Sequence, residues 1–189
     1  HADLAARLDG ERPGDALLKL LPSALQGIPF AFGVAPSNPI SLLIPTACNV
    51  LVSLVTLCLF FRICLVLFDG DRMVSVTAAA VYACLVNTNV YIRHVLPYDW
   101  ALCVGAFALW LTLLESLPPR RALVIGTLSG RVIAVYPGYY TVAAVIGVVT
   151  VGSGAMNGRE RAVRAIVFLT GAMVTLAAFE VLCRIGGIS

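Results

Sequence analysis

Long apolar runs without charge fill most of this chain and limit what it can fold into. The stretch Met73–Ile92 contains twenty residues and no charged side chain, and an α-helix of about that length crosses the hydrocarbon core of a bilayer. Hydrophobic residues make up 60% of the chain and charged residues 12%, whereas soluble domains carry about a quarter charged residues. Too few polar side chains remain to cover a core in water. The sequence therefore predicts an integral, multi-pass membrane protein and excludes a soluble domain.

Six segments of low charge predict an all-α fold, a polytopic transmembrane helical bundle. Charged or proline-containing turns separate them. The six segments are Pro45–Phe68, Met73–Ile92, Trp100–Leu114, Ala122–Tyr136, Gly138–Asn157 and Ala165–Cys183. Because the chain starts at His1 without a methionine and ends inside an apolar pattern, we expect it to be a fragment of a larger protein.

The N-terminal region differs from the rest, and we assign residues 1–38 to an outer-face loop with amphipathic surface helices and residues 39–189 to the transmembrane bundle. Seven of the 23 charges lie in the first forty residues. Apolar residues between Leu17 and Leu25 recur on one face of a helix, and such a helix lies on a membrane surface more readily than it crosses. Three prolines predict a loop after it: Pro29, Pro36 and Pro39.

The dipeptide Pro137–Gly138 interrupts the apolar stretch after Ala122. This stretch forms either one long helix that is kinked there or two short helices. Arginines decide between them, because positive loops prefer the cytoplasmic side. They flank the stretch on both sides: Arg120 and Arg121 before it, and Arg159, Arg161 and Arg164 after it. We therefore predict two short helices that meet at an outer turn, Tyr136–Tyr140. The same rule places the turn Asp69–Arg72 inside and the loop Tyr91–Asp99 outside.

Polar groups in the two outer turns are the candidate substrate-binding residues. Arg93 and His94 suit a phosphate, since a guanidinium donates two parallel hydrogen bonds to phosphate oxygens. Asp99 either belongs to the same cavity or caps the following helix. The tyrosines either contact substrate or form an aromatic belt at the interface; they are Tyr136, Tyr139 and Tyr140.

Other polar and small residues within the apolar segments have structural interpretations. Arg131 lies inside a short segment, where a charge normally faces a partner or a cavity. Glu180 and Arg184 are four residues apart and predict an ion pair on one helix face. Gly126 and Gly130 form a GxxxG pattern, which predicts close helix packing.

The remaining composition argues against several classes of site and partner. Six cysteines lie in apolar runs without a CxxC pair, so we interpret them as small buried apolar residues. No cluster of metal-ligating residues is present in the sequence, and we expect no metal or cofactor in this chain. The net charge of +3 is small and dispersed, which argues against a nucleic-acid partner.

Taken in order, several short motifs resemble the GT-C glycosyltransferases, in particular the protein mannosyltransferase and aminoarabinose transferase type. Leu4, Ala5 and Gly10 resemble the segment after the acidic motif of that family's first loop. Later motifs continue the resemblance over most of the chain: Phe30–Gly33, Phe68–Gly70, the sequence Arg-His-Val-Leu-Pro-Tyr-Asp of Arg93–Asp99, and Leu128–Tyr140, which ends in Tyr-Pro-Gly-Tyr-Tyr. The chain departs from some members at Val135 and Tyr136, because those members have a lysine near the Tyr-Pro.

This resemblance implies an inverting glycosyltransferase of the endoplasmic reticulum or bacterial plasma membrane. Such an enzyme moves a sugar, for example mannose, from dolichyl- or undecaprenyl-phosphate to a protein, lipid or glycan acceptor on the outer or luminal face. Arg93, with His94 second, is then the candidate that stabilises the leaving lipid phosphate. The catalytic acidic residue would precede His1, and a divalent metal is compatible with the intact enzyme.

Two other classes remain open from the residues alone. Short helices broken by proline also occur at transporter binding sites, although no internal repeat is visible in these segments. A noncatalytic membrane subunit of a glycosylation complex is the other alternative, because the expected catalytic acid lies outside the chain.

Overall fold

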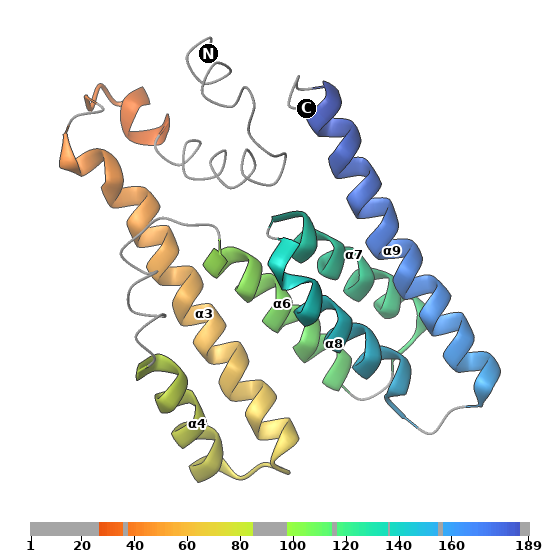
Figure 1. Cartoon of the computed structure of the whole chain (residues 1–189). Helices are drawn as coiled ribbons and strands as arrows, with labels where there is room; N and C mark the ends of the chain where they lie inside the picture. Colours follow the sequence, from red (N-terminus) through yellow and green to blue (C-terminus); the bar gives the residue numbers. More distant parts are fainter. Residues whose placement is uncertain are drawn as a thin grey trace. The chain divides into compact units, whose positions relative to one another are not determined.

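The computed structural model describes residues 27–35, 38–84, 98–114, 117–135, 137–154 and 157–185 (Figure 1). Regular structure in these ranges is helical and contains no strand, which confirms the all-α prediction for this part of the chain. The described residues form two compact units, one ending at Trp110 and the other beginning at Leu111. Each unit is considered by itself below. The predicted boundary between residues 38 and 39 falls at the start of the first long helix, but residues 1–26 lie outside the described ranges.

The first unit contains a long helix, α3 (Leu43–Leu67), which follows the short 3₁₀ helix η1 (Pro39–Leu42). Helix α4 (Arg72–Cys84) packs against α3, and α6 (Tyr98–Leu113) starts in the same unit. The predicted turn between α3 and α4 is confirmed, because Asp69 and Gly70 adopt φ angles of 49° and 85°. Asp71 then caps α4, since its side chain accepts hydrogen bonds from the backbone N–H groups of Met73 and Val74.

One part of the predicted proline loop is wrong. Residues 27–31 are helical, and Pro29 lies inside that segment. Proline has no backbone N–H donor, but the Pro29 carbonyl accepts hydrogen bonds from the N–H groups of Phe32 and Val34, each at 3.1 Å. The segment then ends in a turn at Gly33, which has a φ of 79°.

The second unit contains three helices that run alternately up and down. They are α7 (Pro119–Val135), α8 (Tyr140–Gly152) and α9 (Gly158–Ile185), with the 3₁₀ turn η2 (Pro137–Tyr139) between α7 and α8. Gly126 faces Phe168 and Gly130 faces Ala172, so α7 and α9 run parallel. Helix α8 packs against both and runs in the opposite direction (Figure 1). The prediction of two short helices broken at Pro137–Gly138 is confirmed.

The predicted GxxxG contact is also confirmed and forms the tightest interface in the described chain. A Cβ atom at Gly126 would lie against the Phe168 carbonyl oxygen, and one at Gly130 would lie 2.6 Å from the Ala172 oxygen. Gly171 on α9 is equally restricted, because its Cβ would lie 2.5 Å from the Leu123 oxygen. Backbone therefore meets backbone along α7 and α9, and only glycine permits this approach.

Among the residues that the structure describes, two helical stretches are long and apolar enough to cross a membrane, Pro39–Leu67 and Gly158–Ile185. Less than a quarter of each apolar window is buried within the structure, so most of their large apolar side chains face outward. The other apolar helices, α4, α6 and α8, are shorter. This pattern favours a lipid environment, and a larger number of crossings belongs to the proposal below.

The cysteines only partly match their predicted role as buried apolar residues. Cys64 and Cys183 are buried, Cys48 and Cys103 are half-buried, and all six cysteines are free thiols. Cys58 and Cys84 are exposed, which contradicts the prediction for them. They lie on outward faces of α3 and α4, where the apolar pattern of the sequence does not distinguish a side chain facing lipid from one facing a helix.

Candidate functional site

A polar contact between two apolar helices is the most distinctive side-chain arrangement in the first unit. The Nδ2 group of Asn49 on α3 donates a 3.1 Å hydrogen bond to Oδ2 of Asp99 on α6. Asn49 is completely buried, with 0% of its surface exposed, and Asp99 is half-buried. Fifty residues separate the two in sequence, and the bond holds the start of α6 to the N-terminal part of α3. A carboxylate held in this way between apolar helices usually marks a site with a function.

Asp99 does not act as the N-cap of α6, which was one of its two predicted roles. It is the second residue of the helix, within the first turn, where a negative charge also interacts favourably with the helix dipole. Its side chain turns to Asn49 on another helix. The contact is therefore a tertiary one between α3 and α6, and the role of Asp99 in a substrate cavity stays a prediction.

The other predicted residues of this outer loop, Arg93 and His94, lie outside the described residues. Their assignment as phosphate-binding groups therefore stays a prediction. Tyr136 also lies outside the described residues.

The remaining two tyrosines of the second predicted turn are described. Tyr139 is half-buried and ends η2, and Tyr140 is 64% exposed at the first position of α8. The break between α7 and α8 therefore presents at least one tyrosine ring at the surface. This agrees with both predicted roles, an interfacial belt and substrate contact.

Arg131 does not face a buried partner. It lies one turn before the end of α7 and is exposed, and it makes no ion pair with any residue in the described ranges. The prediction for Glu180 and Arg184 is confirmed, since Arg184 Nε lies 2.9 Å from Glu180 Oε1.

The opposite end of the second unit is basic. The starts of α7 and α9 enclose a surface hollow of ≈ 490 Å³ that is lined by Pro119, Asn157, Arg159, Glu160 and Arg164, among others. The Arg164 guanidinium donates a 2.8 Å hydrogen bond to the Ser153 carbonyl, which ties α9 to the end of α8. The arginines that flank α7 and α8 in sequence therefore meet at one end, as a hairpin of these two helices requires.

Sequence reasoning missed Asn49, although one signal was available. It is an amide in an otherwise apolar helix, a position where a polar side chain requires a partner. A group of three metal-ligating side chains is absent from the described part of the chain.

Comparison with known proteins adds no assignment. No family model matches this chain, and neither a curated protein nor a solved structure matches it.

Proposed function

We propose that this chain is part of a multi-pass membrane glycosyltransferase that moves a sugar from a polyprenyl-phosphate donor to an acceptor on the outer or luminal face. The observation that carries the proposal is the hydrogen bond between Asn49 and Asp99. It supports a polar site between apolar helices at the start of α6, where the motif Arg93–Asp99 ends. The ordered resemblance to GT-C enzymes supplies the reaction.

The proposed topology follows from the arginine turns and the helix lengths. Helix α7 has 17 residues, which span about 25 Å, so it approaches the thickness of a bilayer. Its basic start would lie on the inner side, and the break at Pro137–Tyr139 would lie at the outer face. Asp99 would lie at the outer end of α6 under the same rule.

In the proposed mechanism, an acidic residue deprotonates the acceptor hydroxyl. The acceptor oxygen attacks the anomeric carbon, the bond from that carbon to the phosphate oxygen breaks, and the lipid phosphate leaves with the negative charge. Configuration at the anomeric carbon is inverted. Arg93 would stabilise the phosphate, because its planar donors match two oxygens at once and the charge grows as the bond breaks.

Asp99 would position the loop that carries Arg93. Its bond to Asn49 fixes the first turn of α6, six residues after Arg93. This makes Asp99 a positioning residue, and its substitution should lower transfer less than substitution of Arg93.

The test is sugar transfer from a polyprenyl-phosphate donor by the full-length protein at matched expression. We expect Arg93→Ala to lower the rate about a hundred- to a thousandfold, the usual cost of one lost oxyanion donor, and Arg93→Lys to restore it only in part. Arg120→Ala is the matched control, because Arg120 is exposed at the start of α7, the end that the proposal places inside.

Three outcomes would contradict the proposal. A rate for Arg93→Ala within about threefold of wild type, far short of that cost, would remove Arg93 from the phosphate site. Absence of transfer by the wild-type protein, together with flux of a labelled solute into vesicles, would indicate a transporter. Absence of both activities, with transfer restored by a co-purified enzyme, would indicate a noncatalytic subunit.

A further inference from the structure

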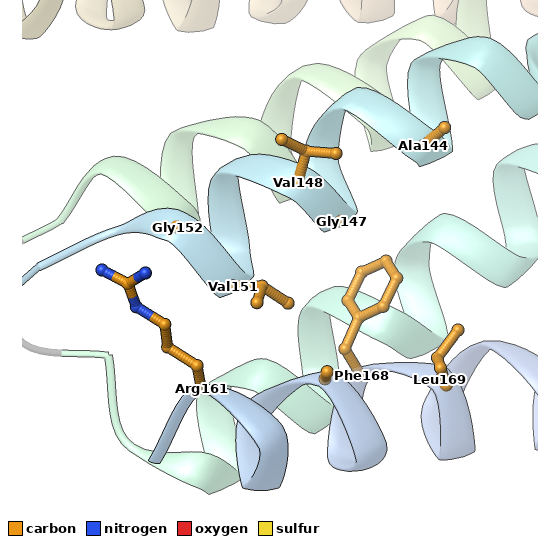
Figure 2. A pocket seen from close by; sticks show the side chains of 9 residues that line it. Ala144, Gly147, Val148, Val151, Gly152, Arg161, Phe168 and Leu169 are labelled. Atoms are coloured by element: carbon orange, nitrogen blue, oxygen red, sulfur yellow. The ribbon is translucent and has the colours of Figure 1, made fainter. Parts of the chain in front are cut away.

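An apolar groove with a single arginine at one end runs along helices α8 and α9 at the protein surface (Figure 2). Its volume is ≈ 490 Å³, and nearly all of its lining is aliphatic or aromatic, including Val148, Val151, Phe168 and Leu169. Along α8 the groove extends from Ala144 to Gly152, which is about 12 Å of helix. Arg161 is the charged residue of this groove.

The floor of the groove is formed by close packing of Phe168 on a glycine. Figure 2 shows the Phe168 ring rising from α9 toward Gly147 on α8. A Cβ atom at Gly147 would lie 3.0 Å from Phe168 Cε1, so the missing side chain lets the buried ring fill the space between the helices. The groove above it is therefore a fixed feature of the packing between α8 and α9.

The arginine lies where α9 changes from charged to apolar. All charges in the first half of α9 fall between Arg159 and Arg164, and the helix is uncharged from Ala165 to Phe179. Figure 2 shows the Arg161 side chain extending toward Gly152 at the end of α8. Its guanidinium makes no hydrogen bond or ion pair with the residues that the structure describes, so its donors are available to a ligand.

We propose that this groove binds one acyl chain of an anionic phospholipid, with the lipid phosphate on Arg161. The occupant must be apolar along most of its length and negatively charged at one end, because the lining has that pattern. The neighbouring basic hollow adds Arg159 and Arg164 at the same end of α9, which increases attraction to an anionic headgroup. This site does not depend on the proposed sugar-transfer activity.

The test is native mass spectrometry of the purified chain with phosphatidylglycerol or phosphatidylcholine of identical acyl chains. We expect phosphatidylglycerol to bind more tightly, and Arg161→Gln to weaken its binding about tenfold or more, the effect of losing a hydrogen bond to a charged group. Arg159→Gln is the matched control. It removes the same charge two residues away, but it lines the basic hollow and not the groove. We expect it to weaken binding about fivefold at most, the effect of a cation near the lipid surface that does not contact the bound lipid.

A second variant tests the apolar part of the groove. Ala144 is exposed at the end opposite Arg161, so Ala144→Leu adds volume to the groove without displacing a buried atom. Excluding about one methylene of the acyl chain from the groove should weaken the binding of both lipids about fourfold. Circular dichroism and the elution volume of each variant establish that it folds as the wild type does.

Four results would overturn the proposal. Equal binding of the two lipids would remove the charge recognition, and equal losses for Arg161→Gln and Arg159→Gln would reduce it to general surface charge. Displacement of the lipid by millimolar glycerol 3-phosphate would indicate a plain anion site. A dimer signal that falls with Ala144→Leu, while lipid binding stays constant, would show that a second copy of the chain occupies the groove.

Discussion

The two units of this protein join their helices in different ways. Helices α7 and α9 approach so closely that three glycines are required, Gly126, Gly130 and Gly171. Helix α3 instead buries small and polar side chains such as Asn49 and Thr56, while many of its large apolar residues are exposed. In lipid, apolar side chains gain no hydrophobic energy by leaving the lipid to contact one another, so van der Waals packing and hydrogen bonds hold helices together. The contact between α7 and α9 depends on packing, whereas the first unit adds a side-chain hydrogen bond between helices, from Asn49 to Asp99.

The largest effect is expected from a single methyl group at the glycine interface. Gly126→Ala should lower the free energy of unfolding by about 3 kcal/mol, because its Cβ meets the Phe168 backbone and the helices must separate. Gly158→Ala is the control, since a Cβ there meets nothing within 4 Å. Unfolding in mild detergent, followed by circular dichroism, measures both. Equal stabilities of the two variants would show that α7 and α9 do not pack backbone to backbone.

The corresponding change in the first unit should lower the free energy of unfolding by less. Asn49→Leu leaves the half-buried Asp99 carboxylate without this donor, at a cost of about 1–3 kcal/mol. A double-mutant cycle with Asp99→Leu isolates the pair, and we expect a coupling energy of about 0.6–1.7 kcal/mol, from the mean to the largest value measured for such bonds between membrane helices. Strictly additive effects would mean that the two side chains do not interact.

A smaller effect is expected where α9 extends beyond α7. The parallel register places Glu180 and Arg184 past the end of α7, and their side chains are 52% and 76% exposed. Glu180→Gln should therefore lower stability by only about 0.3–0.5 kcal/mol. The difference should vanish at 1 M salt, where the Debye length falls to about 3 Å. A loss that persists at high salt would require a tertiary role for this pair.

The smallest change is expected at a buried hydroxyl that bonds only its own helix. Thr56 Oγ1 donates a 2.8 Å hydrogen bond to the Val52 carbonyl of α3. Thr56→Val should alter the free energy of unfolding by less than about 0.5 kcal/mol, because no contact with another helix is lost. A clear destabilisation would show that polar contacts between helices in the first unit extend beyond Asn49.

The sequence predicted a helix well where the uncharged stretch and the helix have the same ends, and less well where their ends differ. The predicted segment Pro45–Phe68 lies within two residues of α3 at both ends. Helix α9 begins at Gly158, seven residues before the predicted Ala165, because a search for uncharged length excludes the arginines of its first turns. Asn157 explains the true start, since its side chain accepts a hydrogen bond from the Glu160 N–H and caps the helix.

Helix α8 shows the reverse error, because it ends at Gly152 and not at the predicted Asn157. Ser153 adopts an extended backbone and its hydroxyl donates to the Val149 carbonyl. Gly154 then takes a φ of 83°. These local hydrogen bonds compete with the helix, and apolar content alone does not detect them.

Of the candidate site, the sequence indicated Asp99 but not its partner. Residues four or fewer apart on one helix can be paired from spacing, as for Glu180 and Arg184. Asn49 and Asp99 are separated by fifty residues, and only the tertiary fold of the first unit brings them together. The apolar groove was missed for the same reason, because its two walls are helices whose register the sequence does not specify.

The parallel arrangement of α7 and α9 also sets an order of events during synthesis. The glycine face of α7 has its partner only after α8 has turned back and α9 has been made, about fifty residues after Val135. At ordinary translation rates this takes about 3–10 s. During that interval the closely packing surface of α7 is open to other helices or to an insertion factor, whereas α4 reaches α3 as soon as it emerges. Assembly errors in this protein should therefore begin at α7.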